Sequence, residues 1–552
     1  MRLWPLLLAL LVLVLGPILL RPHGESVLQG EDTVVVITPH NEAIRDEFGR
    51  GFREWYKKKT GRSIVVDFRT PGGTSEITKF LGGEFDGAFR HYWVDTLHKP
   101  WSGDVAGSFA NPKVKPTEHE ARKAFLDSNV GCGIDVFFGG GSFDFQRSAD
   151  QGMIVSSGYV EGHPEIFGRT IPAVVGGEPY FDDPKGRWIG STIGAFGIAS
   201  NVDHLERLGI HPEPRQWADL ADPRYFRGLA LANPTQSGSA NKAFEMLIQQ
   251  QMIQAVAELA PGKDDDAKAL AEGWARAMKL LQKISANSRY FSDSSSKISL
   301  DVEAGEAVAG MTIDFYGRYQ SEMVRRPDGS SRIAYVNAAG GTSFGVDPVA
   351  LLRGAPHKEE ALRFIEYVMT DGQKLWGWKP EAELKTLKKD PNDGLTPEEW
   401  EAARAGGPKF HALRRLPMLP ELYAAKYRAF RSDPEIQPYE AAKQFSYHDK
   451  WTGKLFQPIA FIVRVMCIDT HDELCAAWQA LIEAKARTGN FPPQALAAFE
   501  DVSEVSYEKT GKDIAGALQK KDKILEVQLA KTLAGKFREN YERAERLARE
   551  GK

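Results

Sequence analysis

Three polar turns of the chain place hydroxyl groups and free backbone N–H groups together at the start of a predicted helix. Thr74 and Ser75 follow two glycines, and Ser237-Gly238-Ser239 precedes the helix predicted over 240–259. His40 and Glu42 lie in a third turn, directly after a β-branched strand. N–H groups at a helix N-terminus suit a small polar or anionic ligand. These turns predict a binding cleft and do not point to a particular reaction.

Each turn also has a purely structural interpretation, which the sequence leaves open. Thr74 can serve as a helix cap, and His40 can point outward while a neighbour caps the helix. Gly140 lies in a run of three glycines after the buried strand predicted for Ile134–Phe138. This run is either a loop that faces a ligand or a tight turn.

Motifs for covalent chemistry are weak. Gly341-Thr-Ser-Phe-Gly345 fits Gly-x-Ser-x-Gly, but a nucleophile elbow needs a helix after the serine. The residues that follow, up to Leu352, predict a strand. The sequence has neither a phosphate-binding Gly-x4-Gly-Lys-Ser/Thr motif nor a His-Glu-x-x-His motif. We therefore expect a binding protein that is not an enzyme and has no resident cofactor.

Length, charge and cysteine content limit the number of domains, the kinds of partner and the disulfides that the chain is expected to have. The chain has 552 residues, a formal net charge of -4 and 42% hydrophobic residues, which favours two or three globular domains and gives no reason to expect a nucleic-acid partner. Of its three cysteines, Cys467 and Cys475 either pair or remain buried thiols.

The N-terminus predicts export. Arg2 precedes an uncharged apolar run over Leu3–Leu20, which is either a cleaved signal peptide or an uncleaved membrane anchor. Both alternatives place the body of the protein outside the cytoplasm, in the periplasm or an equivalent space. The anchor would also give membrane contact through the N-terminal segment.

Strands and helices are predicted to alternate over most of the chain, and this pattern is typical of an α/β fold. Examples are a strand over residues 33–38 with a helix over 42–59, one long strand over 189–200, and a strand over 229–232 with a helix over 240–259. The C-terminal part is predicted to be mainly helical, with a single last helix over 507–549.

At this point the chain resembles the periplasmic solute-binding proteins of ABC importers, of the type 2 class with the iron(III)-type members. The resemblance rests on motifs in a set order: Thr38-Pro-His-Asn-Glu42, Pro71-Gly-Gly-Thr-Ser-Glu76, Asp135-Val-Phe-Phe-Gly-Gly-Gly141, Gly194-Ala-Phe-Gly-Ile-Ala-Ser-Asn201, Trp217-Ala-Asp-Leu-Ala-Asp-Pro-Arg-Tyr-Phe-Arg-Gly228, Ala230-Leu-Ala-Asn-Pro-Thr-Gln-Ser-Gly-Ser239 and Gly305-Glu-Ala-Val-Ala-Gly310. Together they cover about residues 33–380.

The resemblance implies two α/β lobes joined by crossing strands, with a solute clamped between them by hinge closure. The implied division is a signal peptide or anchor over 1–32, lobe 1 over 33–197 with an insertion at 84–129, lobe 2 over 198–313, a return to lobe 1 over 314–383, and a helical extension over 384–552. The implied partners are a membrane permease and its ATPase subunits.

The resemblance also implies ligand contacts. Asp314 and Tyr316 would face the cleft at the return crossing, and His40 with Tyr316 would be the candidate ligands of a transported Fe³⁺ ion. Iron-binding relatives use two consecutive tyrosines, whereas Tyr316 and Tyr319 here are three residues apart. Two other classes remain: an envelope sensor or scaffold with a vestigial cleft, and a secreted α/β hydrolase.

Overall fold

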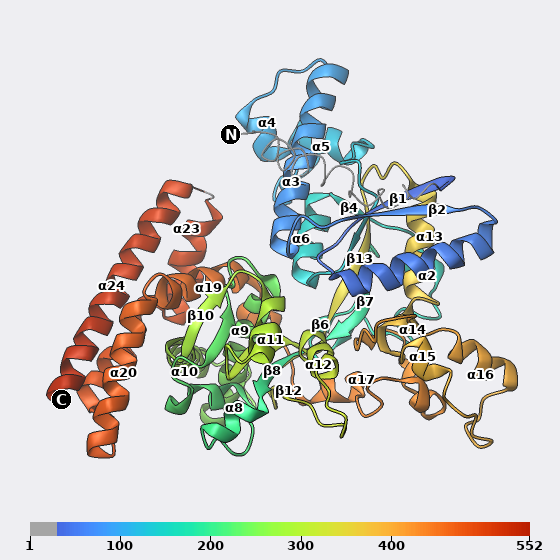
Figure 1. Cartoon of the computed structure of the whole chain (residues 1–552). Helices are drawn as coiled ribbons and strands as arrows, with labels where there is room; N and C mark the ends of the chain where they lie inside the picture. The colour runs from blue at the N-terminus through green and yellow to red at the C-terminus, as the bar shows by residue number, and fades with distance from the viewer. Residues whose placement is uncertain (1–29, 521) are drawn as a thin grey trace, which may run out of the picture.

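The computed structural model describes residues 30–520 and 522–552. Two α/β lobes lie next to each other, and the C-terminal helices, red in Figure 1, lie against the second lobe. The sheet of lobe 1 has the order β14 (Leu416–Pro417), β7 (Trp188–Gly194), β13 (Gly345–Leu352), β3 (Val136–Phe138), β1 (Asp32–Ile37) and β2 (Ile64–Arg69), with β4 (Ile154–Val155) paired to β13. The predicted N-terminal signal or anchor lies outside the described residues.

The sheet of lobe 2 repeats this arrangement. Its order is β10 (Ser288–Ser292), β9 (Leu229–Ala232), β11 (Ala309–Ile313), β8 (Phe196–Asn201) and β12 (Ile333–Asn337). In both sheets three parallel strands are followed by an antiparallel strand that arrives from the other lobe. The predicted two-lobed α/β fold with crossing strands, the type 2 arrangement, is confirmed.

The crossing strands fix how the lobes meet. Ala195 alone separates β7 of lobe 1 from β8 of lobe 2, and the return crossing runs from β12 to β13. The N–H of Phe196 donates to Oγ1 of Thr342 at 2.8 Å, which ties the two crossings together. The long strand predicted for 189–200 is therefore two strands, because its residues pair with a different sheet on each side of Ala195.

Helices cover both sheets, and local capping sets their ends. Asn41 accepts from the N–H of Ile44 at the start of α2, and Gly61 ends that helix with a positive φ of 75°. The main helices are α2 (Glu42–Thr60), α3 (Thr74–His91), α5 (Glu120–Asp127), α6 (Ser142–Gln151), α9 (Gly238–Leu259), α10 (Ala267–Ala286), α11 (Ser295–Ala304), α12 (Asp314–Met323) and α13 (Lys358–Met369).

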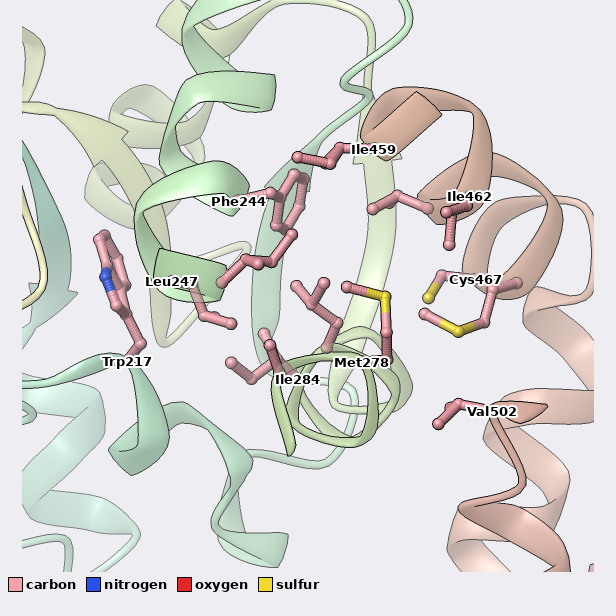
Figure 2. Packing of buried hydrophobic residues seen from close by; sticks show 14 of the residues in the cluster. Trp217, Phe244, Leu247, Met278, Ile284, Ile459, Ile462, Cys467 and Val502 are labelled. Carbon is pink, nitrogen blue, oxygen red and sulfur yellow. The ribbon is translucent and has the colours of Figure 1, made fainter. Parts of the chain in front are cut away.

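The C-terminal extension divides between the lobes. Its first part adds β14 to the sheet of lobe 1 and forms a small core of its own around Trp378, Trp400 and Phe430. Its second part, with α19 (Phe456–Val463), α20 (His471–Thr488) and α24 (Lys523–Glu550), joins the core of lobe 2. Figure 2 shows Ile459 and Cys467 of this part facing Phe244 and Met278. The extension thus makes a third crossing, near residues 442–445.

The structure corrects two predictions and decides between two alternatives that the sequence left open. Lobe 2 continues past the predicted boundary at 313, because β12 pairs with β8. The single helix predicted for 507–549 is broken, and Asp522 caps a new helix, α24, by accepting from the N–H groups of Ile524 and Leu525. Cys467 and Cys475 are free buried thiols, so they do not form the disulfide.

One further segment, Asp449–Ile468, is long and apolar enough to cross a membrane by length and composition. In the structure 67% of it is buried, and its helix α19 packs against α9. Its apolar residues therefore belong to the core of lobe 2.

The extension is fastened to lobe 1 by Glu47 on α2. This fully buried carboxylate accepts from the N–H groups of Lys409 (2.7 Å), Phe410 (2.6 Å) and His411 (3.0 Å), and it pairs with Arg50. We expect Glu47→Gln to lower the free energy of unfolding by about 2 kcal/mol at pH 7, because the three donors lose a charged acceptor. Denaturant titration measures this difference.

The pH dependence gives a second readout. Burial raises the pKa of Glu47, but the three N–H groups and Arg50 lower it more, so its net shift is downward from 4.5. The contribution of Glu47 is therefore complete above its unfolded pKa, and the wild-type advantage should shrink as the pH falls below about 4.5. Glu54→Gln on the same helix, at a side chain 58% exposed, should cost less than about 0.5 kcal/mol. Equal losses in both variants would contradict this assignment.

Candidate functional site

A cavity of about 190 Å³ lies where the two lobes and the extension meet. For comparison, an apolar cavity of about 150 Å³ holds benzene, so this one suits a solute of about six to ten heavy atoms. Its lining comprises Gly141, Ser142, Phe143, Asp144, Gln146, Glu178, Pro179, Trp188, Gly194, Ser343, Gly345, Val346 and Asp347 from lobe 1, Phe196, Gly238, Ser239, Lys242, Glu245 and Ile313 from lobe 2, and Tyr447, Asp449, Gly453 and Phe456 from the extension.

Two predicted turns from opposite lobes meet beside this cavity. A Cβ atom built on Gly73 would lie 3.7 Å from the carbonyl oxygen of Gln236. A Cβ atom on Gly238 would lie 3.5 Å from Oδ2 of Asp144. The predicted convergence of turns from the two halves of the chain is thus observed, in a closed arrangement.

A buried ion network forms one wall. The ammonium of Lys242 lies 3.0 Å from Oε1 of Glu178 and 3.1 Å from Oε2 of Glu245, and 3.7 Å from the ring centre of Tyr447. Burial lowers the pKa of Lys242, but the two carboxylates raise it well above its usual value. Ser343 donates to Glu178 at 2.6 Å. The network therefore joins lobe 1, lobe 2 and the extension.

Ser343 belongs to the Gly-x-Ser-x-Gly match, and its role here is structural. Its hydroxyl is a donor to Glu178, and strand β13 begins two residues later at Gly345. A nucleophile elbow requires a helix at that point. The strand predicted from the sequence is confirmed there.

Asp144 differs from the other carboxylates of the lining. Its residue is only 7% exposed, and no described residue donates a hydrogen bond to its side chain. Burial raises the pKa of Asp144 to about 6, although Arg147 opposes this. Asp144 lies in the first turn of α6 and faces the start of α9, so a carboxylate of the protein already occupies the place where the two helix N-termini would attract an anion.

Next to the cavity, Arg415 fills the space between the lobes. Its fully buried guanidinium pairs with Asp347, donates to Nε2 of His40 at 3.1 Å, and lies 4.0 Å from the ring centre of Phe315 and 5.1 Å from that of Trp376. Asp347, His40 and Trp376 belong to lobe 1, whereas Phe315 belongs to the core of lobe 2. The side chain therefore connects the lobes.

Some of the predicted turn residues line the cavity, and others contact only the protein around it. Gly238 and Ser239 line the cavity. Thr74 and Gly140 contact each other, since a Cβ atom on Gly140 would lie 2.7 Å from Cγ2 of Thr74. Ser237 caps α9 by accepting from the N–H of Ala240 at 3.2 Å, which is the structural alternative for this residue.

The other predicted residues lie outside the cavity lining. Ser75 is half-buried and Glu42 is exposed, each in the first turn of its helix. Asp314 is buried and pairs with Arg318 at 3.0 Å. Burial raises the pKa of Tyr316 to about 12. Burial and the charges of Arg415 and Arg45 lower the pKa of His40 well below its usual value.

This environment bears on the predicted Fe³⁺ ligands His40 and Tyr316. The Nε2 atom of His40 faces the guanidinium of Arg415, and a phenol with a raised pKa is a poor source of phenolate. Among residues 30–520 and 522–552, no group of three or more His, Cys, Asp or Glu side chains is arranged to hold a metal ion. Iron binding stays a prediction.

The sequence interpretation missed Asp144, Lys242, Glu245, Tyr447 and Arg415. A signal existed for two of them, because Lys242 and Glu245 are charged residues in the first turns of the helix that directly follows the Ser237–Ser239 turn. Tyr447 and Arg415 are distant in sequence from the cleft motifs, and no local pattern marks them.

We expect Arg415→Met to lower the free energy of unfolding by about 3–5 kcal/mol, because it leaves the carboxylate of Asp347 buried without its partner. Arg428→Met is the matched control: Arg428 is a 60% exposed partner of Glu435, and its loss should cost less than about 1 kcal/mol. Adding Asp347→Asn to Arg415→Met should recover part of the loss. Denaturant titration that shows Arg415→Met as stable as the control would contradict the role of this pair.

Comparison with known proteins agrees with this geometry. Residues 134–374 match the family model described as bacterial extracellular solute-binding protein. An uncharacterized protein of Haemophilus influenzae is 27% identical over 258 residues, which is 46% of this chain and 63% of that protein. The phosphoglycerate transport regulatory protein PgtC of Salmonella typhimurium is 25% identical over 184 residues, 33% of this chain and 39% of PgtC. The matched segments thus span less than two thirds of these relatives.

Among solved structures, the periplasmic binding protein AfuA of Actinobacillus pleuropneumoniae aligns over 81% of this chain and 98% of its own, with 15% identity and a TM-score of 0.45. Iron-bound HitA of Pseudomonas aeruginosa aligns over 77% and 99%, with 15% identity and a TM-score of 0.41. The two-lobed type 2 fold is shown by the topology of the two sheets, and residues 134–374 are similar to bacterial extracellular solute-binding proteins.

Proposed function

We propose that this chain is an extracytoplasmic solute receptor of an ABC importer. It would capture a small polar or charged solute between its lobes and deliver it to a membrane permease driven by ATPase subunits, with its N-terminal segment as a leader or membrane contact. The observation that supports this most is the cavity of about 190 Å³ between the lobes, to which both lobes contribute. Enclosure between two hinged lobes is how such receptors hold a solute.

The family match supports the same proposal. It covers residues 134–374, which include both crossing strands and all of the lining contributed by the lobes. Ser343, the serine of the Gly-x-Ser-x-Gly match, donates to Glu178 and is not placed as a nucleophile. Binding without covalent chemistry is the function that these residues favour.

A second candidate is an envelope sensor or scaffold. The buried contact of Arg415 with both lobes and the crossing of the extension favour it, because they oppose lobe opening. Transport of Fe³⁺ through His40 and Tyr316 is a third and weaker candidate, since it requires Arg415 to leave His40.

Ligand-induced stabilisation tests the receptor proposal. A solute at about 100 times its Kd should raise the free energy of unfolding by about 2.7 kcal/mol, and thermal shift against amines, phosphate esters, sugars and ferric chelates would reveal it. Ser239→Trp should abolish the shift, because the indole fills the cavity that Ser239 lines.

The matched control is Ser296→Trp. Ser296 is likewise the second residue of a helix and half-buried, but it lies outside this cavity. Stabilisation that survives in Ser239→Trp would place the solute elsewhere. If no solute class stabilises the wild-type chain, the sensor or scaffold becomes the better interpretation.

A further inference from the structure

The charge of the cavity lining is strongly asymmetric. Five carboxylates line it, those of Asp144, Glu178, Glu245, Asp347 and Asp449, against the single ammonium of Lys242. Arg415, behind the wall, pairs with Asp347. Two basic groups for five acidic ones leave a negative potential, which a low-dielectric wall strengthens.

Most of the buried carboxylates of the lining have hydrogen-bond donors or ion-pair partners within the protein. Glu178 accepts from Ser343 and pairs with Lys242, and Glu245 accepts from Tyr447 at 2.9 Å as well as pairing with Lys242. Asp449 is exposed at the rim. Asp144 is the deeply buried acidic group of the lining to which no described residue donates. A buried carboxylate is costly without a partner, so this position favours a donor supplied by the solute.

Aromatic rings also line the cavity. Phe143 of lobe 1 and Phe456 of the extension lie with ring centres 4.7 Å apart and both line the cavity. Carboxylates beside aromatic faces form an environment that binds organic cations. The chain fills such an environment twice with its own side chains, at Lys242 over Tyr447 and at Arg415 over Phe315.

An anionic solute fits less well. The starts of α6 and α9 would favour an anion, but the carboxylate of Asp144 lies between them. The ammonium of Lys242 is already shared by two glutamates. A phosphate or carboxylate group in the cavity would therefore face an unpaired negative charge of the protein.

We propose that the solute is a small organic cation, a primary amine or guanidine of about six to ten heavy atoms, whose charged nitrogen pairs with Asp144. Its carbon chain lies against Phe143 and Phe456. This inference rests on the receptor function proposed above and specifies its substrate class.

Calorimetric titration of the full chain with agmatine and 1,4-diaminobutane tests it, with 3-phosphoglycerate and inositol as the anionic and neutral probes. We expect both amines to bind and the other two probes to bind at least tenfold more weakly. Asp144→Asn should weaken amine binding about 10- to 100-fold, because the solute loses a charged acceptor. Asp150→Asn, in the last turn of the same helix and outside the lining, should change it less than twofold.

The thermal midpoint of each variant without ligand checks that it is folded, and Asp144→Asn should not be destabilised because the residue it replaces has no protein partner. Amine binding that Asp144→Asn leaves unchanged would overturn the inference. Binding of 3-phosphoglycerate or inositol, but of neither amine, would overturn it while leaving the receptor function intact. If no probe binds and the broad solute screen also finds no ligand, both proposals fail together.

Discussion

A guanidinium removed from water must be surrounded by acceptors and polarisable faces, and the packing around Arg415 follows from this requirement. Asp347 supplies the charge, His40 supplies a neutral acceptor, and Phe315 and Trp376 supply aromatic faces. These four residues come from the two lobes, whereas Arg415 itself belongs to the segment that follows lobe 1. Because a buried charge is costly when its partners move away, this group holds the closed arrangement of the lobes.

The C-terminal extension affects how the two lobes of this molecule can open and close. In a two-lobed receptor the crossing strands act as the hinge and the solute joins the faces of the cleft. Here the chain crosses a third time, near residues 442–445, and the segment that follows contributes Tyr447 and Phe456 to the cavity wall. Opening the cavity therefore requires movement of the extension as well as rotation of the lobes.

The cavity and the site around Arg415 contain the same types of side chain. Each joins carboxylates to aromatic faces, and each holds a basic side chain, Lys242 in one and Arg415 in the other. Lys242 pairs with Glu178 and Glu245, so Asp144 remains as a buried acidic group of the cavity with no hydrogen-bond donor among the described residues. Under the proposed receptor function, this remaining charge is where the solute would bind.

The sequence by itself determined the α/β class and the position of most strands, because hydrophobic periodicity and turn residues are local properties. The two lobes were implied by the resemblance to solute-binding proteins and not by these local patterns. The sequence also placed Gly238 and Ser239 on the cleft, since a polar turn before a helix is visible in the sequence. It failed at residues 189–200, where one continuous β pattern serves two sheets, and at Asp522, whose capping role interrupts a charged helical pattern.

Only the tertiary structure decided which side chains meet in the cavity. Arg415 reaches His40 across 375 residues, and Tyr447 reaches Glu245 across 202. Such contacts depend on how the extension packs against both lobes, and no local periodicity encodes that packing. Burial also set the protonation and the contacts of these groups. It lowers the pKa of His40, whose Nε2 atom accepts from Arg415, and it leaves Asp144 in the cavity wall without a hydrogen-bond donor among the described residues.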